Sequence, residues 1–177
     1  MNSAELRQLQ APFKERYRQS PETALQVLTA RGTIDIPTLT VQIHHQGPPL
    51  SRTGLHPLTG GDGKTACAAE MLMEAVIGCA GVTFAAVCTA MGISILSATL
   101  RAEGDLDFRG TLGVSRETPV GFQTVRLIFE IDSPEADEKL EKAVELAERY
   151  CVVAQTLKSI TTTWQRSTGP VDVAQKE

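Results

Sequence analysis

The chain has 177 residues, a formal net charge of −4 and 42% hydrophobic residues, as expected for one globular domain with a sizeable core. Its 21 acidic and 17 basic residues provide no basic surface for a nucleic-acid backbone, so we expect no nucleic-acid partner. Four cysteines are too few for a disulfide-stapled secreted scaffold. The charged N-terminus has no apolar signal segment, so we expect a cytoplasmic protein.

The first elements follow from hydrophobic periodicity. Apolar side chains at three- and four-residue steps predict an amphipathic helix over residues 3–18, with Pro12 inside it. Two strands are expected next, in "ALQVLTARGTI" and "TLTVQIHH", where apolar residues alternate in the second segment. A loop rich in Gly and Pro then leads to a central helix over residues 66–91.

The segment from Ala75 to Leu100 contains no charged residue, and its length meets the threshold for a membrane span. It is dominated by Ala, Gly, Ser, Thr and Cys, however, and Gly92 precedes a strand-like sequence. We therefore expect a buried core helix followed by a buried strand, and no membrane association.

The second half of the chain predicts strands near residues 93–103 and 121–132, followed by a helix capped by Ser133 with Pro134 at its first position. One face of that helix carries Leu140, Ala143, Val144, Ala147 and Cys151. The predicted class is α+β with a mostly antiparallel sheet. We expect an N-terminal helix at 1–20, the main domain at 21–164 and a mobile tail at 165–177.

Two motifs are weighed and set aside. "GGDGKT" ends like a phosphate-binding loop, but Leu58 occupies the position of the required first glycine. His44 and His45 are adjacent on a predicted strand and so point to opposite faces, and His56 has no partner at a ligand spacing. We therefore expect no metal and no bound organic cofactor.

Helical geometry determines which cysteines could come close enough to form a disulfide. Along one helix Cys67 and Cys79 are about 18 Å apart and Cys79 and Cys88 about 13 Å apart, whereas a disulfide requires Cα atoms within about 7 Å. Only Cys151, which points inward from the later helix, can meet one of them. Such a pair is either inert packing or a peroxide-reducing couple, in which one thiolate becomes sulfenic acid and the second thiol condenses with it.

Three segments resemble the OsmC/Ohr family of osmotically inducible and organic-hydroperoxide-resistance proteins. They are "GGDGKTACAAEMLMEAVIGCAGVTFAAVCTAMGI", "EGDLDFRGTLGV" and "LAERYCVVAQTL", within a match over roughly residues 23–163. The resemblance implies an OsmC-like fold in which a mostly antiparallel sheet packs on a long buried central helix. It also implies an intertwined homodimer in which thiols reduce organic hydroperoxides to alcohols.

By the same resemblance, Cys79 is the peroxidatic thiol and Cys151 the resolving thiol. A buried thiol needs a nearby cation to ionise, and family members supply an Arg held by a Glu. The positional candidates are Arg31, with Arg52 as the alternative, and Glu70, with Glu74 as its rival.

The sequence therefore leaves two functional hypotheses. In the first, the chain is a thiol-dependent peroxidase regenerated by an external dithiol or lipoyl-type reductant, with apolar residues such as Met71, Val76 and Phe84 lining the substrate site. In the second, it is a non-catalytic dimer of the same fold that binds an apolar small molecule. The two differ in whether a cation accompanies Cys79, because without one the thiol is expected to stay protonated at neutral pH, which argues against the peroxidase.

Overall fold

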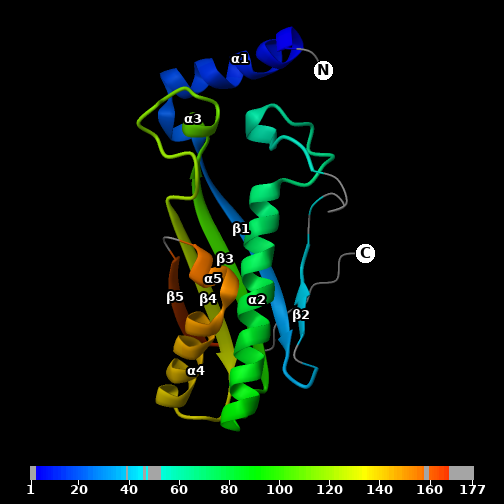
Figure 1. Cartoon of the computed structure of the whole chain (residues 1–177), viewed down its shortest axis with the longest axis vertical. Coiled ribbons are helices and arrows are strands. Elements are labelled where there is room, and N and C mark those ends of the chain that lie inside the picture. The colour runs from blue at the N-terminus through cyan, green and yellow to red at the C-terminus, as the bar shows by residue number, and fades with distance from the viewer. Residues whose placement is uncertain (1–2, 39, 46, 48–52, 158–159, 168–177) are drawn as a thin grey trace. The chain divides into compact units, whose positions relative to one another are not determined.

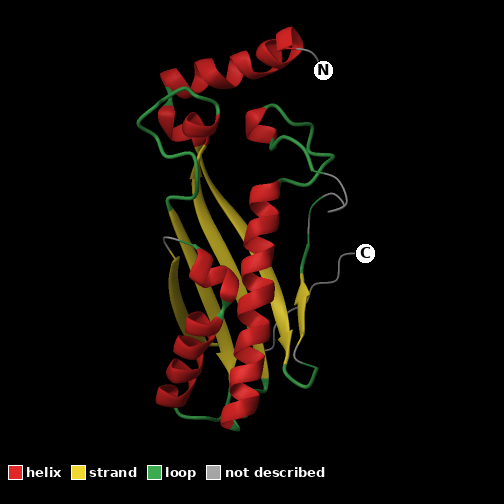
Figure 2. Cartoon of the chain, in the orientation of Figure 1, coloured by secondary structure: helices red, strands yellow, loops and turns green. Residues whose placement is uncertain are grey.

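The computed structural model describes residues 3–38, 40–45, 47, 53–157 and 160–167 (Figure 1). The helices are α1 (Ser3–Gln19), α2 (Ala68–Met91), α3 (Phe108–Thr111), α4 (Asp137–Tyr150) and α5 (Val152–Thr156), with short 3-10 turns η1 (Pro21–Ala24) and η2 (Pro57–Thr59). The strands are β1 (Leu25–Asp35), β2 (Thr40–Ile43), β3 (Ser97–Asp107), β4 (Thr124–Asp132) and β5 (Ile160–Arg166) (Figure 2).

The strands form one mostly antiparallel sheet in the order β2-β1-β3-β4-β5, which confirms the predicted α+β class. The antiparallel register of β1 and β2 pairs Gly32 with Ile43 and Asp35 with Thr40. The chain divides into two compact units, Met1–Thr29 with Gln46–Met73 and Glu103–Val125, and Ala30–His45 with Glu74–Ala102 and Arg126–Glu177.

In the first unit, α1 is fixed to the turn η2. The Tyr17 side chain is fully buried and its hydroxyl donates a 2.7 Å hydrogen bond to the carbonyl of Leu58. Gly60 adopts a left-handed φ of 94°, and a Cβ built there would lie 2.9 Å from Leu9 Cγ. A side chain at this position would therefore be both strained and in collision with α1.

A buried ion pair starts α3 in the same unit. The Asp107 carboxylate has no exposure and accepts hydrogen bonds from the backbone and the guanidinium of Arg109, the shortest of 2.6 Å. These bonds, led by the guanidinium, hold the pKa of Asp107 below its ordinary value. The buried charge is thus compensated by its neighbour two residues on.

In the second unit, α2 packs its buried face on the sheet, where β2 comes close to it. Phe84 of α2 packs on Phe129 of β4 with ring centroids 5.1 Å apart. Gly81 is buried, and a Cβ built on it would lie 2.5 Å from Val41 of β2. Two small residues, Gly78 and Gly81, therefore allow a strand to approach the helix closely.

By length and composition alone, α2 is apolar enough to cross a membrane, and it is the one such helix in the described part of the chain. Its position instead identifies it as a core helix, because Val76, Ile77, Ala80 and Phe84 are fully buried. Figure 1 shows α4 and α5 beside it on the same face of the sheet. The expectation of a buried helix followed by a strand is met by α2 and β3.

Two predictions about the second half were wrong in detail. Ser133 does not cap a helix, because α4 begins at Asp137 with Ala136 before it. The Ser133 hydroxyl instead donates to the carbonyl of Ser94 at 2.6 Å and accepts from the amide of Glu135 at 3.1 Å. The hydroxyl therefore stabilises the turn between β4 and α4.

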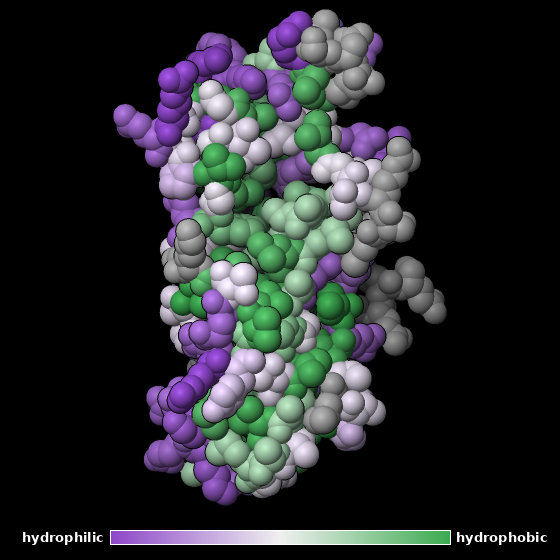
Figure 3. Space-filling view, viewed as in Figure 1, coloured by the Kyte–Doolittle hydropathy of each residue, from purple (hydrophilic) through white to green (hydrophobic). Residues whose placement is uncertain are grey.

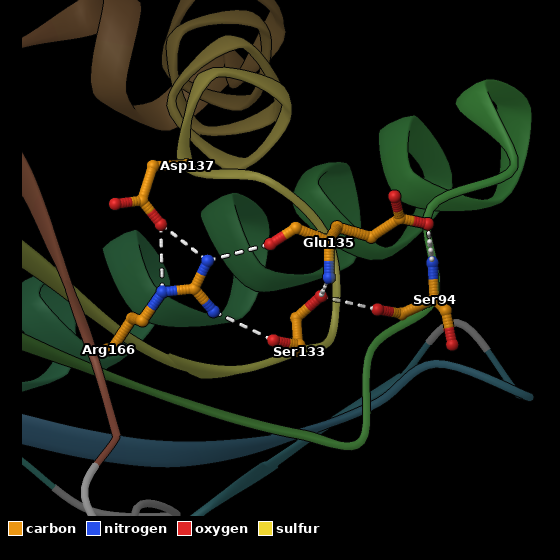
Figure 4. Close-up of polar contacts among 5 residues, drawn as sticks. All are labelled: Ser94, Ser133, Glu135, Asp137 and Arg166. Atoms are coloured by element: carbon orange, nitrogen blue, oxygen red, sulfur yellow. Dashed lines mark hydrogen bonds and ion pairs between the residues drawn. The ribbon is translucent and has the colours of Figure 1, made fainter.

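The predicted single helix is two helices, and a fifth strand follows them. Residues 165 and 166, expected in the tail, belong to β5, while residues 168–177 lie outside the described part. Figure 4 shows Arg166 joining β5 to the start of α4: its guanidinium donates to the carbonyls of Ser133 and Glu135, each at 2.7 Å, and contacts Asp137. Arg166 thus donates hydrogen bonds to two carbonyls of the turn that would otherwise bond to water.

Candidate thiol site

Cys79 lies in the middle of α2, on the side of the helix that the core leaves partly open. Its side chain is half-buried, whereas Val76, Ala80 and Phe84 around it in sequence are fully buried. Val82, one turn further along, is 42% exposed. Of the side chains expected to line the site, Val76 and Phe84 therefore belong to the core, and Val82 is the apolar side chain that accompanies Cys79 at the surface.

Cys151 occupies the break between α4 and α5. Its backbone is extended, with φ −76° and ψ 109°, so it ends one helix and caps the next. Its sulfur accepts a hydrogen bond from the amide of Ala154 at 3.4 Å, and its side chain is fully buried. The prediction placed Cys151 inside a continuous helix, whereas the structure shows a break at this residue. Because of the break, the first residues of α5 lie next to the thiols.

The two thiols meet in the second unit. The neighbours that lower the pKa of the Cys79 thiol are the Cys151 thiol, the backbone amides of Val152 and Val153 and the hydroxyl of Thr83. Both cysteines are free thiols. The inference that only Cys151 can meet a thiol of the central helix thus agrees with the structure. We call the backbone N–H groups of Val152 and Val153 the amide cradle.

The surroundings make the two thiols unequal acids. Burial raises the pKa of Cys79, but hydrogen bonds from Val153, the Cys151 thiol, Val152 and Thr83 together bring it below 9.0. Burial raises the pKa of Cys151 to about 11, and the neighbouring Cys79 adds to that rise while the amides of Ala154 and Val153 oppose it. Cys79 is therefore the thiol that ionises first.

The expected arginine is not beside Cys79 within the described chain. Arg31 is exposed on β1, and its neighbour Gly32 is the residue that faces Ile77 of α2. Because successive residues of a strand point to opposite faces, the Arg31 side chain lies on the face of the sheet away from α2. Arg52 lies outside the described residues.

The two candidate glutamates have histidine neighbours. Glu70, in the first turn of α2, lies 4.0 Å from Nε2 of His56. Glu74 has a side chain only 12% exposed and contacts Nδ1 of His45 at 2.5 Å. Its other carboxylate oxygen is buried without a hydrogen-bond partner among the described residues. Neither carboxylate holds an arginine in the described contacts.

Sequence reasoning missed the groups that contact the Cys79 sulfur. Backbone amides carry no side-chain signature, so nothing in "CVVAQT" indicates that they converge on another helix. Thr83 carried a signal, because a residue four positions after Cys79 lies on the same helix face. Its hydroxyl donates a hydrogen bond to the Cys79 carbonyl at 2.8 Å, which fixes it one helical turn from Cys79.

The remaining cysteines have different surroundings. Cys88 is fully buried, and burial raises its pKa to about 12, so its thiol stays protonated and unreactive at neutral pH. Cys67 is half-buried and precedes α2. Among the described residues, no group of three or more His, Cys, Asp or Glu side chains could hold a metal ion.

The fold is α+β, and the site is a pair of thiols between the central helix and a later helix. Together they define the class of protein. The family model described as OsmC-like protein matches residues 61–165, more than half of the chain. The protein therefore belongs to the OsmC-like family. A comparison with curated protein sequences gives no match.

Solved structures share the fold. An OsmC-like hydroperoxide resistance protein from Jannaschia sp. CCS1 is 18% identical, with a TM-score of 0.53 over 79% of this chain and 91% of that chain. An organic hydroperoxide resistance protein OsmC from Legionella pneumophila is 16% identical, with a TM-score of 0.52 over 78% of this chain and 96% of that chain. At these identities the likeness is one of fold.

Proposed function

We propose that this protein is a thiol-dependent peroxidase that reduces organic hydroperoxides to alcohols, with Cys79 as the attacking thiol and Cys151 as the resolving thiol. The observation that carries the proposal is the pair of neighbouring free thiols, of which Cys79 has its pKa lowered and Cys151 has its pKa raised. Two proteins of the same fold are described as hydroperoxide resistance proteins, which supports a peroxide-linked redox role.

The chemistry follows from the contacts. The Cys79 thiolate, stabilised by the amide cradle and Thr83, attacks the terminal peroxide oxygen and becomes sulfenic acid while the O–O bond breaks. The neighbouring Cys151 thiol attacks that sulfur, which forms the disulfide and releases water. An external dithiol or lipoyl-type reductant then restores the two thiols. Hydrogen-bond donors that are already in place before the reaction stabilise the negative charge of the thiolate, which is the role expected of the cation.

Preference for organic peroxides is expected from the apolar surface beside the pair. Val82 and Val152 are 42% and 74% exposed, and Figure 3 shows apolar side chains gathered on the face where α2 and α5 lie.

The exposed small and apolar side chains of α2, among them Ala75, Val82 and Ala86, also support the proposed homodimer, because an apolar stripe of this kind is usually covered. We place this activity in the cytoplasm.

The test measures consumption of cumene hydroperoxide with dithiothreitol by wild type, Cys79→Ser and Cys151→Ser. We expect Cys79→Ser to lose at least about a hundredfold in rate, and oxidised wild type to contain a Cys79–Cys151 disulfide by peptide mass analysis. Cys67→Ser is the matched control and should retain the wild-type rate. If Cys79→Ser consumes peroxide as fast as wild type, the peroxidase proposal is wrong.

A further inference from the structure

One ring nitrogen of His56, in the first unit, must stay unprotonated to keep its contact. Its Nδ1 accepts a 3.1 Å hydrogen bond from the backbone N–H of Leu58, which makes His56 the cap of the turn η2. A neutral imidazole that accepts at one nitrogen carries its hydrogen on the other, so the hydrogen of this ring is on Nε2. A second proton would have to bind Nδ1, where it would face the Leu58 N–H. Protonation of His56 therefore breaks this hydrogen bond.

The other contacts of the His56 ring do not depend on its protonation state. The His56 side chain is 12% exposed, and its ring stacks on Phe108 of α3 with centroids 4.8 Å apart. Nε2 lies 4.0 Å from Oε1 of Glu70, whose side chain is 47% exposed. A proton on Nδ1 leaves both contacts in place. The hydrogen bond from Leu58 is thus the contact that distinguishes the neutral ring from the charged one.

The turn that His56 caps is also the place where α1 is bound. Leu58, whose N–H donates to His56, accepts the 2.7 Å hydrogen bond from Tyr17 of α1 at its carbonyl. The Gln10 side chain of α1 donates to the Thr59 carbonyl at 3.3 Å. The Thr59 amide and hydroxyl in turn donate to the His56 carbonyl at 2.8 and 2.9 Å. The carbonyls that hold α1 therefore belong to the two residues whose position the His56 cap helps to fix.

Neighbouring charges do not replace the contact that the charged ring loses. The charged groups on the elements packed around the ring are Glu70 of α2, Arg16 beside Tyr17 of α1, and the Asp107–Arg109 pair on either side of Phe108. Glu70 favours the charged ring, but burial is the larger effect, and it lowers the pKa of His56 below its ordinary value. A ring in water binds a proton more readily than the ring in this contact. Acid therefore favours the released turn, from about pH 6.5 downward.

We propose that His56 is a pH-sensitive switch, in which protonation of Nδ1 releases α1 from the turn η2 while the second unit stays folded. Near neutral pH the uncharged ring caps the turn, and Tyr17 stays buried. When the ring becomes charged, the Leu58 N–H loses its acceptor and the turn loosens. Tyr17 and the apolar face of α1 then become accessible to solvent. This switch does not depend on the proposed peroxidase function.

The test is amide hydrogen exchange of the full chain, followed by mass spectrometry at about pH 7.5 and about pH 5. For each peptide of α1, the exchange rate of the unstructured peptide at the same pH is divided by the observed rate, which gives a protection factor. Wild type is compared with His56→Asn, whose amide oxygen can accept like Nδ1 but does not titrate. His56→Phe keeps a ring that can stack on Phe108 and has no acceptor. His44→Gln, in the second unit, is the matched control, and the peptides of α4 report whether that unit stays folded.

In wild type and in His44→Gln, we expect the protection factor of α1 to fall at least about fivefold at the lower pH, the size expected for one hydrogen bond. Protection of α4 should not change. His56→Asn should keep the same α1 protection at both pH values, and His56→Phe should have the lower value at both. Unchanged α1 protection in wild type overturns the proposal. The same fall in His56→Asn also overturns it, because another group would then be titrating, and so does an equal loss in α1 and α4, which would be acid unfolding of the whole chain.

Discussion

The thiol of Cys79, in the middle of α2, is the neighbour of the thiol of Cys151 at the break between α4 and α5, and each shifts the other's pKa. Because the two lie far apart in the sequence, the contact depends on how α4 and α5 pack beside α2. The break matters as much as the contact, since the amides that follow Cys151 reach Cys79 only because α4 ends there.

Thr83→Val should make Cys79 a weaker acid. The substitution removes a hydroxyl that lowers the pKa of the Cys79 thiol and keeps the shape of the side chain. A single hydrogen bond of this kind corresponds to about threefold in the iodoacetamide alkylation rate of Cys79 at pH 7, and the midpoint of the rate against pH should move upward. Thr89→Val is the matched control, because Thr89 bonds the Ala85 carbonyl at 2.9 Å in the same way. Equal effects in both variants would contradict the assignment.

Arg31→Ala should leave the alkylation rate of Cys79 within about a factor of two of wild type. The Arg31 side chain is exposed on the face of the sheet away from α2, so its charge is screened from the thiolate by solvent. The same iodoacetamide measurement over pH checks this. A tenfold loss of rate would instead show that Arg31 reaches the thiol from a second subunit.

Gly81→Ala should destabilise the protein by about 1–3 kcal/mol, because its Cβ would lie 2.5 Å from Val41 Cγ2 and 3.4 Å from Ile34 and Leu100. Gly78→Ala is the matched variant, because its nearest neighbour, Ile43, would lie 3.6 Å away. That is ordinary contact, and alanine favours a helix by up to about 1 kcal/mol. Urea unfolding measures both. A Gly81→Ala protein as stable as the Gly78→Ala protein would show that β2 can move away from α2.

Stability should fall above pH 9, and Cys88 should contribute to that fall. The folded state keeps the Cys88 thiol protonated until about pH 12 because it is buried, whereas the unfolded chain loses the proton near its ordinary value of 9.0. Between these values the unfolded state binds fewer protons, so raising the pH favours unfolding by up to about 1.4 kcal/mol per pH unit.

Urea unfolding of the reduced protein at several pH values should show a shallower decline in Cys88→Ala than in wild type. The comparison uses the slope with pH, because removing a buried side chain lowers stability at every pH. Part of the decline in stability with pH should remain in both proteins, because the Cys151 thiol also has a raised pKa of about 11 in the folded state. Identical slopes would mean that Cys88 ionises in the folded state as easily as in the unfolded chain.

Local patterns determined much of the fold. The repeat of apolar side chains placed α1 within a residue of its observed end at Gln19, and the uncharged run placed the core helix α2, because a segment without charge is most stable when buried. The same reasoning missed β5, although "ITTTWQR" alternates half-buried and exposed residues. A short strand of threonines is defined by its pairing partner, here shown by Ser167 donating to the Ile131 carbonyl at 2.9 Å, and that partner is distant in sequence.

The sequence by itself determined which sulfur atoms could meet, since helical rise keeps Cys67, Cys79 and Cys88 apart and leaves Cys151 as the one available partner. Only the tertiary structure decided what surrounds them. It brings backbone amides and a threonine hydroxyl to Cys79, and it places Arg31 on the other face of the sheet. The reason is physical: helix periodicity is a local property of the chain, whereas the acidity of a thiol depends on donors that arrive from residues far away in sequence.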